Sequence, residues 1–174
     1  MLNFNRLWNA HPTIGGPSNP CSSAGTANFP NQCAICLGTA LARCGIETKK
    51  IPGARHCWQH DRSAGHILRA EELAVGLTRR VLPGLGQREK IGPEDYERAI
   101  RGRTGIIFFK DYWRRTVGGR REAQRNRSGD HIDLWNGSRM TDWKSWFRIR
   151  LGLTIPGVWS DLEASRQIWF WRLM

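Results

Sequence analysis

The sequence predicts a single α+β domain over residues 1–174, with helices in its N-terminal part and an antiparallel sheet in its C-terminal part. Apolar residues recur with helical spacing within about the first hundred residues. Beyond them, short runs rich in aromatic and β-branched residues alternate with turn signals, among them an Asn-Gly pair. A chain of 174 residues is long enough to bury a substantial core as one domain.

The first long helix is predicted over residues 31–45, NQCAICLGTALARCG. Asn31 suits the N-cap, because its side chain can accept a hydrogen bond from an unpaired N–H of the first turn. From Ala34 to Leu41, apolar residues recur at spacings of three and four and form one buried stripe. Cys33 is therefore expected in the first turn of a buried helix.

Two further helices are predicted over residues 66–79, HILRAEELAVGLTR, and residues 93–100, the latter opened by Pro93 at its first position. Residues 11–30 are rich in Pro, Gly, Ser and Asn, which predicts an irregular surface segment. Residues 114–128 are rich in arginine and lack apolar periodicity, which indicates a mobile loop.

Strands are predicted over residues 104–113, 129–135, 138–143 and 166–173. The Asn-Gly pair at 136–137 predicts a two-residue type I′ turn, because such a turn needs positive φ at both positions. In that register Trp135 faces Ser138, and His131 falls directly opposite Asp142. Side chains paired in this way have Cβ atoms about 5 Å apart.

Cys33, His131 and Asp142 thus form a candidate catalytic triad. The first turn of a helix offers unpaired N–H groups and the positive end of the helix dipole, and both stabilise a thiolate at Cys33. His131 would be the base and Asp142 the group that orients it. Asp133 shares the face of His131 but lies two residues along the strand, a poorer position. The N–H groups at the helix start, including that of Cys33, would serve an oxyanion.

The net charge of +12 favours polyanionic partners, namely nucleic acid, anionic lipid headgroups or an acidic cell-wall polymer. The N-terminus lacks the apolar stretch of a secretory signal, and no run approaches the ~20 apolar residues that span a bilayer. Five cysteines are nevertheless a high count for a cytosolic protein. Together these features favour a protein that leaves the cytosol by a route without a cleaved signal.

Zinc is the main chemical alternative. Cys33, Cys36, Cys57 and His60 have an acceptable structural spacing, C-x2-C-x20-C-x2-H. With such a site, the chain would be a non-catalytic basic module that binds nucleic acid. Against it, the C-x-x-C runs into an apolar helical stripe, whereas zinc knuckles place this pair in a tight turn. A thioredoxin-like dithiol is also disfavoured, because the Pro/Gly/Asn-rich segment before the helix is no strand.

The remaining polar residues give weaker signals. His56, His60 and His66 are expected to be surface or interhelical polar groups, and His11 carries no signal. Cys36 suits buried packing or a disulfide. The chain contains neither a P-loop nor a dinucleotide-binding glycine fingerprint.

Several motifs together resemble family 4 of the type VI secretion amidase effectors. They are NQCAI at 31–35, CW at 57–58, HILRAEELA, GIIFFKDYW and above all GDHIDLWNG at 129–137. The resemblance runs from the first residues to the last strand. This family is in turn similar to the NlpC/P60 branch of the papain-like cysteine peptidases, so the resemblance implies a papain-like fold with the nucleophile at a helix N-terminus packed on the sheet.

The resemblance also implies a function. Such effectors are injected by one Gram-negative bacterium into the periplasm of another, where they cut the peptidoglycan peptide stem between the γ-carboxyl of D-glutamate and meso-diaminopimelate. The nucleophile falls on Cys33, the base on His131 and the third member on Asp142. No metal or cofactor is implied, nor nucleic-acid binding or membrane insertion. A cognate immunity protein that occludes the active site is an implied partner, besides the secretion machinery.

The cysteines set this chain apart from the family pattern. Cys36 stands where the family leads us to expect an arginine. Cys33 must stay free for catalysis, so Cys21, Cys36, Cys44 and Cys57 could form up to two disulfides in three connectivities. Cys44 with Cys57 is the preferred pair, since both flank the segment that leaves the helix.

Overall fold

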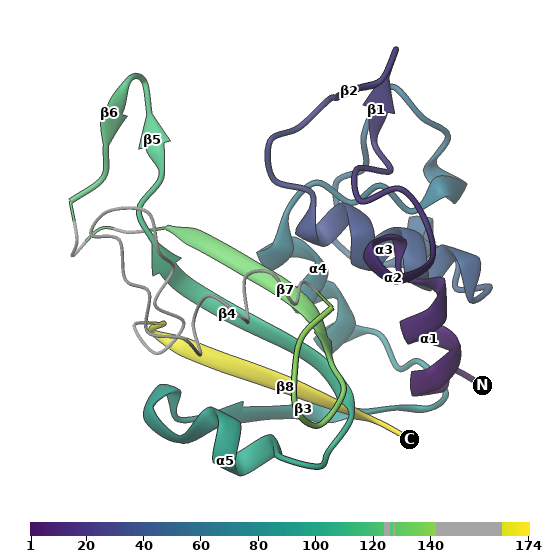
Figure 1. Cartoon of the computed structure of the whole chain (residues 1–174), viewed down its shortest axis with the longest axis vertical. Helices are drawn as coiled ribbons and strands as arrows, with labels where there is room; N and C mark the ends of the chain where they lie inside the picture. The colour runs from purple at the N-terminus through teal and green to yellow at the C-terminus, as the bar shows by residue number, and fades with distance from the viewer. Residues whose placement is uncertain (124–125, 127, 142–164) are drawn as a thin grey trace.

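The computed structural model describes residues 1–123, 126, 128–141 and 165–174, and it has an α+β architecture (Figure 1). The helices are α1 (Phe4–Ala10), α2 (Pro12–Gly15), α3 (Cys33–Arg43), α4 (Ala70–Arg79) and α5 (Tyr96–Ile100), with short 3-10 turns η1 (Thr48–Lys50), η2 (Arg62–Ala64) and η3 (Pro93–Asp95). The strands are β1 (Ser22–Ser23), β2 (Thr26–Ala27), β3 (Leu85–Ile91), β4 (Gly105–Trp113), β5 (Thr116–Val117), β6 (Arg120–Arg121), β7 (Gly129–Trp135) and β8 (Gln167–Leu173).

The main sheet has four antiparallel strands in the order β3-β8-β4-β7. Its two central strands are the most apolar runs of the chain, and they pair with Phe108 opposite Trp169. The predicted strands over 104–113, 129–135 and 166–173 are confirmed. Strand β3 was not predicted, because LGQREKI is charged and half-exposed, as an edge strand can be.

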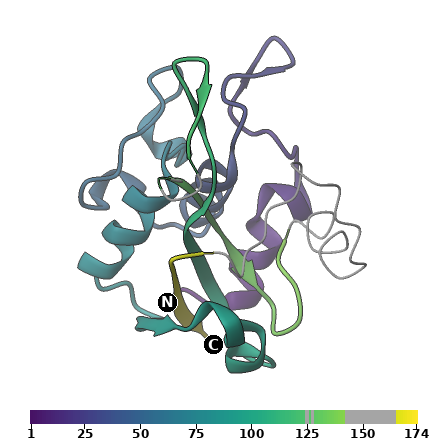
Figure 2. The same cartoon turned by 90° about the vertical axis from the view of Figure 1, so that its left-hand side faces the viewer.

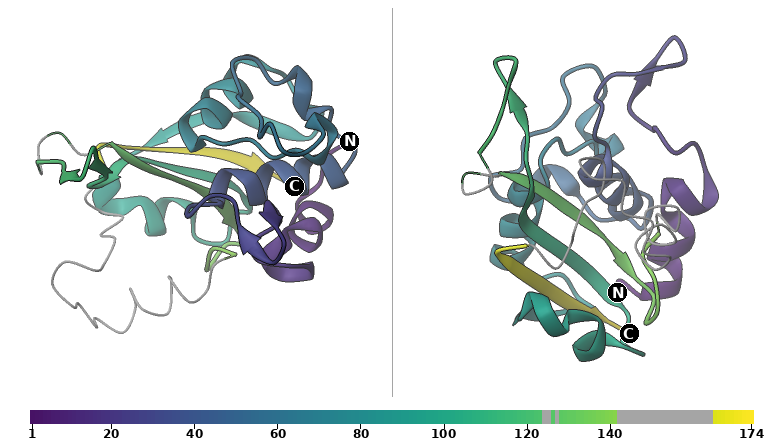
Figure 3. Two further views of the ribbon diagram at one scale, coloured as in Figure 1. Left: turned by 90° about the horizontal axis from the view of Figure 1, so that it is seen from above. Right: turned by 60° about the vertical axis from the view of Figure 1, so that its left-hand side comes forward.

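The core has two layers, because successive side chains of a strand point to opposite faces. Ile106 and Phe108 of β4 face one layer, which contains α1, α3 and α4. Ile107 and Phe109 face the other layer, which is covered by α5. Figure 3 shows α4 and α5 on opposite sides of the sheet. The apolar stripe predicted for residues 31–45 is the face by which α3 joins the first layer.

Two helix starts differ from their predicted positions. The N-cap of α3 is Gln32, although the Asn31 Oδ1 accepts a hydrogen bond from the N–H of Cys33 at 3.1 Å. Helix α4 begins at Ala70 and not at residue 66, because residues 66–68 are extended. Ile67 forms a bridge with His56 there. The predicted helix at 93–100 is confirmed as η3 followed by α5.

The predicted two-residue turn at Asn136 and Gly137 is wrong. Gly137 has a φ of +96°, but Asn136 is not among the residues with positive φ. The Oδ1 of Asn136 instead accepts hydrogen bonds from the N–H groups of Ser138 and Arg139, at 3.1 and 2.9 Å. The turn is shifted by one residue, because the N–H of Asn136 donates to the carbonyl of Arg139 at 3.0 Å and Trp135 pairs with Met140 and not with Ser138.

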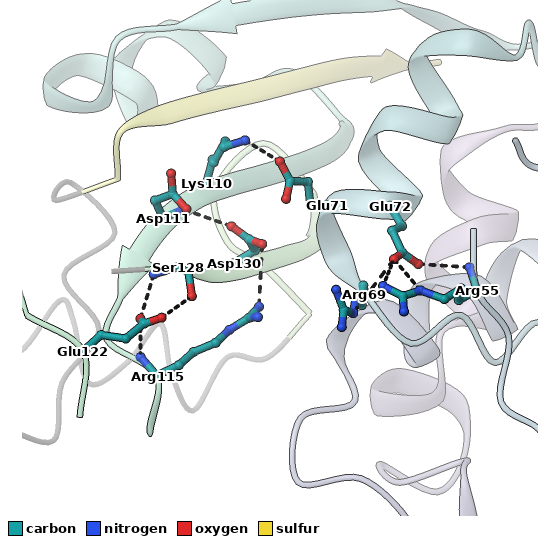
Figure 4. Close-up of polar contacts among 10 residues, drawn as sticks. All are labelled: Arg55, Arg69, Glu71, Glu72, Lys110, Asp111, Arg115, Glu122, Ser128 and Asp130. Atoms are coloured by element: carbon teal, nitrogen blue, oxygen red, sulfur yellow. Dashed lines mark hydrogen bonds and ion pairs between the residues drawn. The ribbon is translucent and has the colours of Figure 1, made fainter. Parts of the chain in front are cut away.

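Both irregular segments contain short hairpins that extend from the same end of the molecule (Figures 1 and 2). Strands β1 and β2 lie within residues 11–30, which also contain Cys21, fully buried rather than at the surface. Strands β5 and β6 lie within residues 114–128. Glu122 fixes the base of this second hairpin, because its Oε2 accepts the N–H groups of Arg115 and Ser128, both at 2.9 Å (Figure 4).

Over the part of the chain that the structure describes, no helix combines the length and the apolar character that crossing a bilayer requires.

Helix α3 is held close to the loop that precedes α4. A Cβ added to Gly38 would lie 2.1 Å from the carbonyl oxygen of Gly65, which has a φ of +75°. Backbone atoms cannot move aside as a flexible side chain can. We therefore expect Gly38→Ala to lower the free energy of unfolding by about 2 kcal/mol or more, at the upper end of overpacking costs, as measured by urea unfolding.

Gly92→Ala is the matched control, because an added Cβ there meets no atom within 4 Å and the φ of −66° suits any residue. Its unfolding midpoint should stay within experimental error of the wild type. Equal midpoints for the two variants would show that the contact between Gly38 and Gly65 is not tight in solution.

Candidate functional site

The structure brings Cys33 and His131 into contact. Cys33 is the first residue of α3 and is half-buried, while His131 lies in the middle of β7, the edge strand against which α3 packs. The two side chains lie close enough that Cys33 raises the pKa of the His131 imidazole. A thiol at a helix start and an imidazole on the neighbouring strand thus meet, although they are almost a hundred residues apart in sequence.

Asp133 also lies beside the imidazole. Its Oδ2 is 3.8 Å from the Nε2 of His131, which is an electrostatic contact longer than a hydrogen bond. The carboxylate is buried, and its Oδ1 accepts hydrogen bonds from the N–H of Leu134 at 2.7 Å and from the hydroxyl of Thr141. Asp133 is therefore a fixed negative charge beside His131, in the position that the sequence analysis ranked second.

Asp142 lies outside the described residues. The register from which its pairing with His131 was deduced is not the one observed, because Trp135 pairs with Met140. The two-residue turn therefore gives no geometric support to Asp142, and its role stays a proposal based on the family resemblance.

His11 is a member of the site that the sequence analysis missed. It lies between α1 and α2, is 2% exposed, and places its Nε2 3.9 Å from the Oδ1 of Asp133. Neither ring nitrogen has a hydrogen-bond partner among the residues described here. Burial lowers the pKa of His11, against the opposing effect of Asp133. No motif around residue 11 indicates this contact, which folding alone creates.

The charges of the site stabilise one another. Burial alone would lower the pKa of His131, but its contacts with Asp133 and Cys33 outweigh burial and raise that pKa well above its ordinary value. Burial would likewise raise the pKa of Asp133, but His131 and His11 lower it below its ordinary value. An imidazolium beside a carboxylate is therefore the favoured state near neutral pH.

Cys36, the second cysteine of the C-x-x-C, is buried, and its thiol bonds to the backbone. It is 5% exposed, and its thiol donates to the carbonyl of Ser18 at 3.5 Å. Burial raises the pKa of Cys36 to about 12. Such a thiol is a poor nucleophile, so the structure supports the predicted packing role and not a redox dithiol.

A network of charged residues supports the sheet end near the site (Figure 4). The Oδ1 of Asp130 accepts the N–H of Asp111 at 3.0 Å, and Lys110 pairs with Glu71 of α4. Burial raises the pKa of Asp130 to about 6, and Arg115 lies 3.7 Å away. Asp111 has a φ of +52° within an irregular part of β4, so this bond fixes the backbone next to His131.

A second cluster contains Cys21, Cys57, His60 and His66, whose ligand atoms all lie within 4.8 Å of one another. Of the alternative zinc set considered from spacing, Cys57 and His60 are in this cluster, but Cys33 and Cys36 are not. Of the three histidines expected to be surface or interhelical groups, His66 is buried at 5% exposure, while His56 and His60 are half-buried.

The preferred disulfide is also wrong. All five cysteines are described, and all are free. Cys44 packs in the main core with α1 and α3, whereas Cys57 packs beside Cys21 in a separate cluster.

Comparison with known families gives one match. Residues 29–171 match the model of a family described as "Type VI secretion system (T6SS), amidase effector protein 4". The matched range includes both Cys33 and His131 and covers most of the chain. A search of curated proteins found no match.

Asp133→Asn should lower the pKa of His131, because it removes the negative charge that opposes the effect of burial. The stability that the raised pKa of His131 contributes is fully present below its unfolded value of 6.5 and disappears as pH rises through the folded pKa. That of Asp133 is present above 3.8 and disappears as pH falls through its lowered pKa. The variant should therefore lose most stability, relative to wild type, between about pH 4 and 6.5.

NMR titration of the histidine rings measures the pKa, and urea unfolding at several pH values measures the stability. Asp130→Asn is the matched control, since it changes a second buried carboxylate of β7 whose partners are Asp111 and Arg115. An unchanged His131 titration in Asp133→Asn would contradict the coupling.

Proposed function

Since this chain belongs to the family of type VI secretion system amidase effectors 4, we propose that it hydrolyses the amide between the γ-carboxyl of D-glutamate and meso-diaminopimelate in the peptidoglycan stem. Membership in the family implies a peptidoglycan substrate and delivery by type VI secretion. The contact between Cys33 and His131 supports the proposal most directly, because amide hydrolysis needs a nucleophile and a group that moves protons, both at the same carbonyl.

In the proposed mechanism His131 holds the proton and Cys33, at the N-terminus of α3, reacts as the thiolate paired with it. The sulfur attacks the γ-carbonyl carbon of D-glutamate, and the amide nitrogen departs with the proton that His131 donates. A thioester then joins Cys33 to the glutamyl group. His131 takes a proton from water, the hydroxide cleaves the thioester, and the Cys33 thiolate and the free γ-carboxyl group are released.

The oxyanion of the tetrahedral intermediate requires hydrogen-bond donors. The N–H of Cys33 already donates to the Asn31 Oδ1, so its expected use as an oxyanion donor requires that the Asn31 side chain move away. The positive end of the α3 dipole is independent of that bond and favours both the thiolate and the oxyanion.

Two carboxylates are candidates for the group that orients His131. Asp133 sets the charge next to the ring, but at 3.8 Å it is too far from the Nε2 for a hydrogen bond. We propose that Asp142, which the resemblance assigns as the third member of the triad, orients the ring, while Asp133 supplies electrostatic stabilisation.

The proposed site of action is the periplasm of a Gram-negative target cell. A net charge of +12 favours adsorption to a wall polymer rich in carboxylates. We further propose that an immunity protein of the producing cell covers the mouth of the site at Cys33.

Cys33→Ala should abolish the release of peptide fragments from purified peptidoglycan without changing the unfolding midpoint. Mass spectrometry of the digest identifies the bond, because the proposed cleavage leaves a free α-amino group on diaminopimelate and a free γ-carboxyl on glutamate. Cys44→Ala, which removes a core thiol that contacts neither site, should retain the activity. Fragments released by Cys33→Ala would disprove the nucleophile, and wild-type cleavage at another bond would disprove the assigned amide.

Asp142→Asn and Asp133→Asn separate the two proposed roles. Loss of the orienting group should lower kcat by about 100-fold or more while KM changes little, as expected for a residue that acts only through the base. We expect this for Asp142→Asn, whereas Asp133→Asn should mainly shift the pH profile of kcat/KM toward lower pH. If Asp142→Asn retained wild-type kcat, Asp142 would have no role in catalysis.

A further inference from the structure

We propose that Cys21, Cys57, His60 and His66 bind one zinc ion, which stabilises the segments around the start of α3. The four side chains come from two loops whose cysteines, Cys21 and Cys57, are 36 residues apart in sequence, yet their ligand atoms gather within 4.8 Å. Three of the four residues are buried, and the cluster is separate from Cys33 and His131.

The distances within the cluster are those of a tetrahedral metal site. The Sγ atoms of Cys21 and Cys57 are 3.5 Å apart, and each lies 3.6 Å from the Nδ1 of His60. With zinc–sulfur bonds of about 2.3 Å and zinc–nitrogen bonds of about 2.0 Å, tetrahedral edges are about 3.8 Å between sulfurs and about 3.5 Å between sulfur and nitrogen. The side chains are therefore already placed around a common centre.

The fourth side chain provides an independent observation. His66 is 5% exposed, and its Nδ1 is buried without a hydrogen-bond partner in the described part of the chain. Its ring meets that of His60 edge to face, with centroids 4.5 Å apart. A buried nitrogen without a partner costs free energy, and a cation at the centre of the cluster gives its lone pair a partner.

The surroundings of the sulfur atoms suit thiolates. The N–H of Gln59 donates to the Sγ of Cys57 at 3.3 Å, and the Nδ2 of Asn28 donates to the Sγ of Cys21 at 3.6 Å. Such outer donors fix and tune metal-bound sulfur. Two thiolates and two neutral imidazoles balance the charge of Zn²⁺ and exclude the harder Mg²⁺ and Ca²⁺, which prefer oxygen.

Four protein ligands fill a tetrahedral zinc site and leave no position for water, so the site is structural. Its link to the active site is short. The N–H of Cys21 donates to the Oε1 of Gln32 at 3.0 Å, and the Nε2 of Gln32 donates to the carbonyl of Cys21 at 2.9 Å. Gln32 directly precedes Cys33. Zinc on Cys21 would therefore fix the residue that positions the nucleophile.

The zinc content of the full-length protein tests this proposal without reference to catalysis. Protein purified under reducing conditions from cells grown with zinc should contain one equivalent of zinc by elemental analysis. Exchange for Co²⁺ should give the intense visible bands of a tetrahedral site and a sulfur-to-cobalt charge-transfer band. Cys57→Ser and His66→Ala should each lose most of the metal, whereas the matched Cys33→Ala should keep it.

Folding is monitored by circular dichroism, so that metal loss through unfolding is recognised. If the variants unfold, the test is made on the wild-type protein. A strong chelator should then remove its zinc, lower its melting temperature and make the thiols of Cys21 and Cys57 reactive. A folded wild-type protein without metal would overturn the proposal, as would a disulfide between Cys21 and Cys57 in that protein. Zinc lost in Cys33→Ala but kept in Cys57→Ser would place the metal at Cys33 instead.

Discussion

The packing of α3 against the edge strand β7 is the constraint on which the whole site depends. Leu37 and Leu41 of the helix and Ile132 and Leu134 of the strand share one core layer, and all four are essentially inaccessible to solvent. Full burial of such side chains stabilises the fold by about 1.5–3 kcal/mol each. The polar residues at this junction contribute no comparable burial. The apolar packing of α3 against β7 is therefore what places Cys33 next to His131.

The charged residues at that junction are maintained at a cost. Asp133 is almost fully buried, and a buried ionised group is tolerated only when partners compensate for its lost hydration. His131, Thr141 and the backbone of Leu134 compensate Asp133. The same compensation raises the pKa of His131, so the electrostatic balance that permits burial also keeps the ring protonated beside Cys33.

The parts of the fold that could be predicted are those that a local pattern of apolar residues in the sequence specifies. Strands β4 and β8 are continuous apolar runs, and α3 has a clear stripe. The hairpin register could not be predicted, because the Asn136 side chain bonds the turn backbone and excludes the type I′ geometry. His11 was missed for a different reason: its contact with Asp133 joins segments more than a hundred residues apart and leaves no local pattern.

The C-x-x-C shows why the spacing of cysteines does not by itself identify a metal site. Three residues along a helix turn the side chain by about 300°, and here that difference separates the half-buried Cys33 from the buried Cys36. The first residue of a helix is well positioned only when both the helix and the loop before it are fixed. Strand β7 holds the helix side, and the pair of hydrogen bonds between Cys21 and Gln32 holds the loop side. The cluster of Cys21, Cys57, His60 and His66 therefore helps to position the candidate site, although it lies outside it.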